Sequence, residues 1–276
     1  MRKAKDKTLK FLMSLCAAVT CLLLIGLIGY LLYRGIPGIN AKFLTTQTSY
    51  ISDSIGILPN ILNTLYLIVL VMIIVVPLGV GAAVYLTEYV SNKRISNAIG
   101  FAVETLTGIP SIIFGLVGML FFTQISGLRQ GILAGSLTLM IMVLPTVISN
   151  TKESLLAVPQ SYREGALALG SGKWHMVRTV VLPNAVDGIV TGCILAVGRV
   201  VGESAALLFT AGFGLKLLGF AEALQSSAAS LTVALYIYAS EEGKFDVAFS
   251  IAVILICITL IINLAASLVG KKVRKS

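Results

Sequence analysis

The chain contains 276 residues, of which 57% are hydrophobic and 12% are charged. Soluble domains carry about 25% charged residues, so this composition excludes a soluble globular protein and indicates a membrane protein with several spans. It also excludes a disulfide-stapled secreted module and a disordered chain. The formal net charge of +9 resembles that of a nucleic-acid-binding protein, but the positions of the basic residues give it another meaning.

Six segments with little or no charge are long enough to cross a bilayer, which takes about 20 apolar residues. A seventh charge-free stretch, residues 223–240, has a polar first half and indicates a short or re-entrant segment at one face. We therefore expect an all-α membrane protein with six transmembrane helices. In chain order the predicted spans are residues 11–33, 61–85, 105–126, 131–151, 188–212 and 247–270.

The basic residues lie mainly on one side of these spans. With the N-terminus in the cytoplasm, the inner segments hold 15 Lys and Arg, the outer segments hold five, and Arg199 lies within a span, which accounts for all 21. This asymmetry follows the positive-inside rule and predicts a multi-pass cell-membrane protein with both termini cytoplasmic and no nucleic-acid partner. The N-terminal segment imitates a signal peptide but has no small-residue cleavage site before Arg34, so we expect a retained first span.

Catalytic and metal-binding side chains are scarce. The four cysteines fall within predicted spans without metal-ligand spacing, and His175 is the only histidine. The spans also lack the paired carboxylates that acid–base chemistry requires. We therefore expect residues 1–276 to form a single transmembrane domain that is not an enzyme, has no catalytic residues and holds no metal.

The fourth connection, residues 152–187, is long and patterned. Residues 160–169 are predicted to form a helix that ends at Gly170, a residue type that favours helix C-termini. A second short helix is predicted at residues 173–181, before Pro183. Two short helices with a fixed bend, placed between two spans, indicate a cytoplasmic docking element for another protein.

The bend of this loop imitates a phosphate-binding loop, because residues 170–173 read Gly-Ser-Gly-Lys. A phosphate-binding loop also requires a glycine five residues before the Gly-Lys pair and a Ser or Thr after it. Leu167 and Trp174 occupy those two positions. The chain is therefore expected to bind no ATP or other cofactor, and an ATP-driven process would need a separate ATPase subunit.

Seven residues of the loop lie at the spacing of a known motif: Glu164, Gly165, Ala166, Gly170, Val180, Leu182 and Pro183. This set resembles the EAA motif of ABC-importer permeases, in which Glu-Ala-Ala is followed by Gly and then by Ile-x-Leu-Pro. Gly165 and Val180 depart from that pattern, and Gly165 lowers helix propensity by about 1 kcal/mol relative to Ala. The resemblance implies that the loop couples to ATPase subunits that hold ATP and Mg. The alternative is an amphipathic helix that rests on the membrane.

Two charged residues, Arg199 and Glu203, lie in the predicted fifth span, four residues apart and thus on one helix face. Charges at that depth cost several kcal/mol and usually mark functional positions. One interpretation is a neutralised pair that locks helix packing. The other is that Arg199 binds an oxyanion through two parallel hydrogen bonds, while Glu203 orients it, neutralises it between transport events and accepts a hydrogen bond from protonated phosphate.

The residues around this pair read Gly-Arg-Val-Val-Gly-Glu-Ser-Ala-Ala-Leu-Leu-Phe-Thr at 198–210, and residues 108–116 read Gly-Ile-Pro-Ser-Ile-Ile-Phe-Gly-Leu. Both segments resemble the permease subunits of phosphate importers, and the Leu-Phe-Thr ending is similar to the PstA type rather than the PstC type. The resemblance implies the type I (MetI-like) ABC-importer permease fold. It also implies half of a translocation pathway that includes Arg199, Glu203 and Ser204.

The same resemblance implies the partners, which are a PstC-like permease, two PstB-like ATPases and a PstS-like extracellular phosphate-binding protein. The outer loop before the last span has four acidic and two basic residues, so it would not attract a free anion, and delivery by a binding protein fits better. Two alternatives remain open. One is a permease for another oxyanion, such as sulfate, molybdate or phosphonate, and the other is a scaffold that mainly signals phosphate status.

Overall fold

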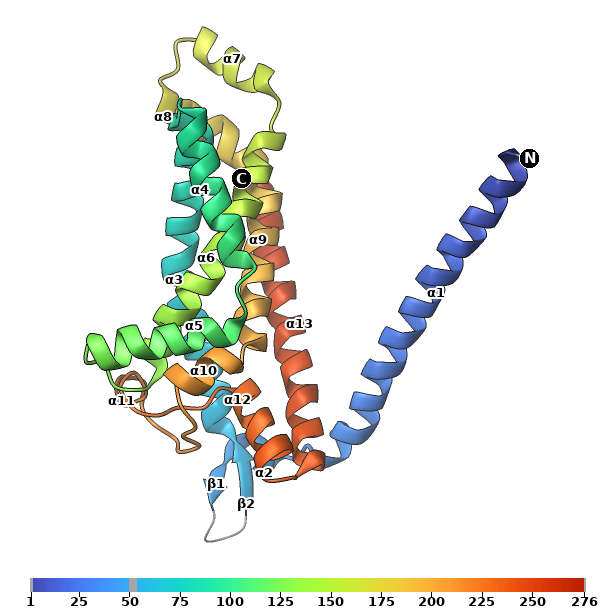
Figure 1. Cartoon of the computed structure of the whole chain (residues 1–276), viewed down its shortest axis with the longest axis vertical. Coiled ribbons are helices and arrows are strands. Elements are labelled where there is room, and N and C mark those ends of the chain that lie inside the picture. The colour runs from blue at the N-terminus through green and yellow to red at the C-terminus, as the bar shows by residue number, and fades with distance from the viewer. Residues whose placement is uncertain (1, 50–53, 276) are drawn as a thin grey trace.

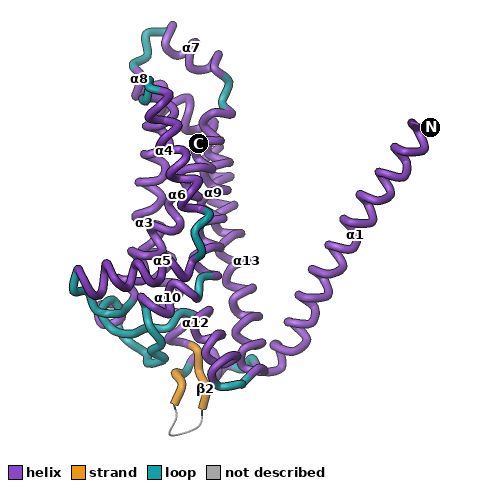
Figure 2. The backbone as a smooth tube through the Cα atoms, in the orientation of Figure 1, coloured by secondary structure: helices purple, strands orange, loops and turns teal. Residues whose placement is uncertain are grey.

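The computed structural model describes residues 2–49 and 54–275, which form an elongated helical bundle with one long helix set apart (Figures 1 and 2). The predicted all-α class is confirmed. We call residues 152–187 the coupling loop, after its predicted role. This loop, which contains α7 (Gln160–Ala168), lies at the same end of the molecule as the start of α1 and the C-terminus (Figure 1). The long helices are α1 (Arg2–Gly35), α3 (Leu58–Val84), α6 (Ile132–Ala157), α9 (Leu182–Gly202) and α13 (Phe245–Lys275).

The centre of the bundle is the place where α6 packs between α3 and α9, while α13 packs on α9. Apolar side chains from the three central helices fill this region and exclude solvent. Between membrane-spanning helices, close van der Waals packing rather than transfer from water holds such side chains together. The buried residues of this core include Leu67, Val71, Val75, Leu139, Met142, Val143, Ala196 and Val200.

The number of spans depends on how one bent pair of helices is counted. Within the described residues, five helices are long and apolar enough to cross a membrane. A sixth crossing exists only if α4 (Lys93–Thr107) and the helix that follows it act as one broken span. The five continuous candidates are Asp6–Gly38, Leu58–Tyr89, Ile132–Ala157, Lys173–Gly202 and Phe245–Leu268.

The predicted third span, residues 105–126, is wrong as a straight helix. α4 ends at Thr107, and α5 (Ser111–Gly118) with the π-helical η3 (Met119–Ile125) departs at an angle of 98°, so that α5 lies across the bundle in Figure 1. Pro110 supplies the physical reason, because proline lacks an N–H and disfavours helical backbone in the residue before it.

The predicted fifth span, residues 188–212, is also wrong in its bounds. α8 (Lys173–Met176), the π-helical η4 (Val177–Val181) and α9 form one helix, Lys173–Gly202. The second loop helix therefore runs into the span and does not end before Pro183. This proline lies inside that continuous helix, directly after the π-helical turn, an irregularity of the hydrogen-bond ladder at which its missing N–H is tolerated.

Short elements close the end of the bundle opposite α7. η1 (Ile36–Gly38), α2 (Ala41–Thr45) and an antiparallel hairpin of β1 (Gln47–Ser49) and β2 (Ser54–Ile57) lie between α1 and α3. Between α9 and α13 come four short helical segments, so the prediction that residues 223–240 do not span is confirmed. These segments are α10 (Ala205–Thr210), α11 (Phe220–Ala223), α12 (Leu231–Tyr236) and the π-helical η5 (Ile237–Glu241).

α1 stands away from the bundle and contacts it only near its C-terminal end (Figure 1). There the Tyr30 ring meets the Phe249 ring of α13 edge-on, with centroids 5.6 Å apart. Arg34 lies over the same Phe249 ring and pairs with Asp246 at 3.0 Å. None of the most apolar stretch of α1 is buried within the chain, so lipid or another chain must cover it.

α5 approaches the first turn of α10 closely at Gly115. A Cβ atom at this position would lie 2.8 Å from the Cα of Ala206 and 3.0 Å from the Phe209 ring, distances that real Cβ atoms rarely show. The glycine is therefore required for α5 to support α10, the short helix that begins directly after Glu203 and Ser204.

We predict that Gly115→Ala lowers the thermal unfolding midpoint, because overpacking of this kind costs about 1–3 kcal/mol. Gly81→Ala on α3 is the matched control: a Cβ there meets no atom within 4 Å, and alanine gains about 1 kcal/mol of helix propensity. Circular dichroism of the detergent-solubilised variants measures both midpoints. An unchanged or higher midpoint for Gly115→Ala would contradict the close approach of α5 to α10.

Candidate functional site

The two charges of the predicted fifth span do not share a helix face. Arg199 lies in the last turn of α9, whereas Glu203 ends the helix with an extended backbone, φ −83° and ψ 120°. Glu203 is 9% exposed, and its Oε1 accepts a hydrogen bond from the Ala206 N–H at 3.0 Å. The carboxylate therefore caps the first turn of α10 and forms no ion pair with the Arg199 guanidinium.

The interpretation of Arg199 and Glu203 as a neutralised pair that locks helix packing is thus wrong, and, contrary to the functional interpretation, Glu203 does not orient Arg199 in this structure. Within the described part of the chain, Arg199 forms no ion pair with Glu203 or with another acidic side chain. It remains a half-buried cation at the C-terminal end of a spanning helix, where only the helix dipole favours its charge. Ser204 follows at the start of α10, half-buried, and its hydroxyl makes no hydrogen bond among the described residues.

The interruption between α9 and α10 is stabilised by hydrogen bonds from residues at the start of α12. The Thr232 hydroxyl donates to the Glu203 carbonyl at 2.9 Å, the group that would accept a helical hydrogen bond if α9 continued. Ser230 lies beside it, with 3.0 Å between the two hydroxyl oxygens, and accepts from the Val233 N–H at 3.2 Å. These contacts satisfy the backbone groups that the interruption frees.

The first turns of α3 hold the same segment in place. Asn60 and Asn63 both donate to the Ala229 carbonyl, at 3.0 and 3.1 Å, and the Thr64 hydroxyl accepts from the Leu231 N–H at 2.9 Å. All three side chains are at most 2% exposed. The sequence gives one signal for them, the cluster of polar residues at the start of an apolar helix, but it does not identify their partner.

The coupling loop has the predicted first helix, α7, which ends as expected at Gly170. Gly170 has φ +81° in the left-handed region, its N–H donates to the Leu167 carbonyl at 3.0 Å, and the Ser171 N–H donates to the Ala166 carbonyl at 3.1 Å. This is the arrangement by which glycine closes a helix C-terminus. Of residues 152–187, only 158–172 lie outside the two long helices that flank the loop.

The predicted coupling residues divide into two groups. Glu164, Gly165, Gly170 and Pro183 are exposed. Ala166 and Leu182 are half-buried instead, against an apolar cluster under the loop that contains Leu155, Met176, Val177 and Val181. Large apolar side chains also face outward from this loop, namely Tyr162, Leu167, Leu169 and Trp174, of which Leu169 is 91% exposed.

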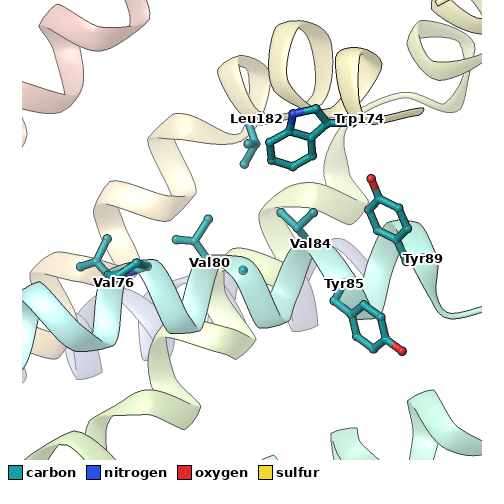
Figure 3. Close-up of a pocket in the computed structure, with 9 residues that line it drawn as sticks. Val76, Val80, Val84, Tyr85, Tyr89, Trp174 and Leu182 are labelled. Carbon is teal, nitrogen blue, oxygen red and sulfur yellow. The ribbon is translucent and has the colours of Figure 1, made fainter. Parts of the chain in front are cut away.

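An apolar groove of about 600 Å³ lies between α3 and the start of the α8–α9 helix. Figure 3 shows Trp174 and Leu182 facing the row of Val76, Val80 and Val84 across it. None of its nine lining residues is charged. A groove of this kind offers no charge-assisted hydrogen bond to an oxyanion, so the anion-binding candidate stays at Arg199.

Comparisons with known proteins agree with this architecture. The family described as "Binding-protein-dependent transport system inner membrane component" matches residues 75–275. The probable ABC transporter permease protein YqgI of Bacillus subtilis is 36% identical over 99% of this chain and 98% of its own length. The phosphate transport system permease protein PstA of Xylella fastidiosa is 35% identical over 66% of this chain and 63% of its own length.

A solved structure shows the same fold. A chain of the bacterial alginate ABC transporter, in complex with a pentasaccharide-bound periplasmic protein, superposes with a TM-score of 0.69 at 16% sequence identity and covers 100% of this chain and 98% of its own. At that identity the likeness concerns the fold alone. Together with the family match and the relative aligned from end to end, it shows that the chain belongs to the binding-protein-dependent transport inner membrane components and is a multi-pass permease subunit of an ABC importer.

Proposed function

We propose that this permease forms half of the translocation pathway of an ATP-driven phosphate importer, with Arg199, Glu203 and Ser204 on the path of the anion. The observation that carries the proposal is the half-buried Arg199, which has no counter-ion among the described residues. An unpaired guanidinium in an apolar bundle costs several kcal/mol. A phosphate oxyanion would offset that cost with two parallel charge-assisted hydrogen bonds.

The neighbouring residues support an oxyanion as the ligand. Ser204 carries a hydroxyl with no hydrogen-bond partner in the described chain, five residues after Arg199, and it can donate to an anion. Glu203 engages Ala206 through one carboxylate oxygen. The second oxygen is the acceptor we assign to the O–H of hydrogen phosphate, a group that sulfate lacks at neutral pH. The relative named for phosphate transport supports the same substrate.

The assembly follows from the same proposal. The exposed residues of the coupling loop would contact two PstB-like ATPases, which hold ATP and Mg, and a PstC-like permease would supply the other half of the pathway. The coupling loop and both termini lie at one end of the molecule (Figure 1), which we assign to the cytoplasm. The opposite end, where Phe213, Leu217 and Phe220 are exposed, would receive a PstS-like binding protein.

We expect Arg199→Gln to reduce phosphate uptake about 10- to 100-fold, the effect of losing a charge-assisted hydrogen-bonding group. Arg199→Lys keeps the positive charge but loses the planar guanidinium that donates two parallel hydrogen bonds, so we expect an intermediate uptake rate. Uptake is measured in proteoliposomes that contain the co-expressed complex, with pull-down of the ATPase as the assembly check. Arg94→Gln, an exposed arginine on α4, is the control. Normal uptake by assembled Arg199→Gln complexes would refute the pathway role.

Glu203→Gln should change selectivity more than assembly. The amide oxygen of Gln can still accept from the Ala206 N–H, so α10 remains capped. The second carboxylate oxygen is replaced by an amide NH2 group, which donates a hydrogen bond and no longer accepts one. We expect the preference for phosphate over sulfate to fall about tenfold, which corresponds to one charge-assisted hydrogen bond. Competition of sulfate with labelled phosphate uptake measures this ratio. A variant with the full rate and the full preference would rule out the assigned role of Glu203.

Leu169→Ser should weaken ATPase binding about tenfold or more, because burying one leucine side chain contributes about 1.5–3 kcal/mol and Leu169 is 91% exposed in the isolated chain. Ile95→Ser is the matched control, an apolar residue on α4 that is 51% exposed and lies outside the coupling loop. Affinity is measured with the purified ATPase on detergent-solubilised permease. Equal affinities for wild type and Leu169→Ser would show that the ATPase docks elsewhere.

A further inference from the structure

Arg163 lies beside the predicted coupling residue Glu164 but faces the opposite way. Glu164 is exposed, whereas the Arg163 side chain is only 11% exposed and is held by four hydrogen bonds. Its Nη1 donates to the Val158 carbonyl and its Nη2 to the Leu155 carbonyl, both at 2.7 Å, at the end of α6. Its Nε and Nη2 donate to Oε1 of Glu88, at 3.1 and 2.9 Å.

Glu88 belongs to a part of the chain that is distant in sequence from the coupling loop. It lies in the π-helical η2 (Tyr85–Tyr89), which continues α3 as one helix from Leu58 to Tyr89. The side chain of Glu88 is 6% exposed. The next residue makes a second contact, because the Lys173 ammonium of α8 lies over the Tyr89 ring at 5.1 Å. Both sides of the bend at Gly170 are thus attached to the end of α3.

The strength of this attachment follows from burial. Exposed ion pairs contribute about 0–1 kcal/mol, and the Arg34–Asp246 pair, with side chains 44% and 82% exposed, is of that kind. Removing one partner of a buried pair leaves an uncompensated charge, which is strongly unfavourable. Separation of α7 from η2 would therefore expose or orphan the charges of Arg163 and Glu88, which favours movement of the two segments together.

The opposite end of the same helix reaches the substrate site. Asn60, Asn63 and Thr64 hold the backbone of residues 229–231, and Thr232 of that segment bonds to the Glu203 carbonyl. A helix of 32 residues extends about 48 Å at 1.5 Å per residue. Figure 1 shows α3 running from the coupling end of the bundle to the end with the short helices.

We propose that the Arg163–Glu88 pair transfers movement of the coupling helix to α3, and that α3 carries this movement to the segment that holds the break at Glu203. This route is additional to the continuous α8–α9 helix. It rests on the proposed coupling of the loop to an ATPase, but not on the identity of the transported ion. Arg163 acts here as a positioning residue, because it belongs to the coupling helix α7 and contacts Glu88 at the end of the α3–η2 helix rather than substrate.

The experiment compares Glu88→Gln, Arg163→Lys and the double variant with wild type, in the assembled complex with its ATPases. Glu88→Gln keeps the shape and one acceptor, and Arg163→Lys keeps the charge, so the fold is challenged as little as possible. Arg94→Gln is the control for an exposed arginine at the same end of the molecule. The first readout is the ratio of uptake to ATP hydrolysis in proteoliposomes.

The second readout reports the far end of the route directly. Gln225→Cys places a thiol at an exposed position of the segment before α12, on a background in which Cys16, Cys21, Cys193 and Cys257 are alanine. Its rate of reaction with a membrane-impermeant maleimide is measured without nucleotide and after vanadate trapping of ATP. This rate does not depend on which ion the importer carries.

We expect the wild-type labelling rate to change on trapping, and each single variant to reduce that change and the uptake-to-hydrolysis ratio about 2- to 30-fold, the range of coupling effects from such positions. The losses in the double variant should be clearly less than the sum of the two single losses, because both single changes remove the Arg163–Glu88 interaction. Additive losses, a full labelling response in both single variants, or no response in wild type would overturn the proposal.

Two further results separate this inference from the functional proposal. If neither single variant binds the ATPase, the pair serves assembly and the transmission role is refuted. If the wild-type complex carries no phosphate but its labelling response depends on Glu88 and Arg163, the phosphate proposal fails while the route through α3 stands.

Discussion

A helix that ends within the bundle leaves backbone groups that need other partners, and α9 ends in this way at Gly202. Each freed polar group would cost several kcal/mol without a partner. The structure supplies these partners. The Glu203 carboxylate accepts from the Ala206 N–H, and the Thr232 hydroxyl donates to the Glu203 carbonyl. The segment that brings Thr232 is itself an irregular stretch with backbone groups to satisfy, and Asn60, Asn63 and Thr64 satisfy two of them.

The same interruption determines the electrostatics of the candidate site. In a continuous helix, Glu203 would lie one turn beyond Arg199 and neutralise it. Because the backbone becomes extended at Glu203, the carboxylate serves α10, and the guanidinium is left at the end of α9 without a counter-ion in the described chain. A site that is already neutral has little reason to bind an anion. The break therefore converts a structural ion pair into a cation that an incoming oxyanion can neutralise.

The first helix of the loop, α7, was predicted well because its signals are local. Pro159 precedes α7, and Gly170 ends it with a positive φ, so both boundaries are encoded by residue types with fixed backbone preferences. The break in α9 has no comparable signal. Residues 188–212 are apolar and helix-compatible almost throughout, and the hydrogen bonds that compensate the interruption come from residues 60–64 and 229–232. Sequence periodicity alone cannot show such partners.

Two other features illustrate the same limit. Pro110 indicates a disturbance of the helix, but the 98° angle between α4 and α5 depends on the packing of α5 against α10 at Gly115. Arg163 reads as an ordinary charged residue of an amphipathic helix, and its burial depends on Glu88, 75 positions earlier. The predicted geometry of the two charges at residues 199 and 203 was wrong for the same reason.

The proposed coupling loop connects to the candidate site through more than one helix. The α8–α9 helix reaches from Lys173 to Gly202 and stops there, so a displacement along it reaches Arg199 but not the segment beyond the break. α10 is instead fixed by α5 and by the Glu203 cap, and the capping segment is fixed by α3. Arg199 and Glu203 thus lie on elements connected to the coupling loop by different helices. Under the proposed function, relative movement of α9 and α3 would change the distance between the cation and the carboxylate, and with it the hold on a bound oxyanion.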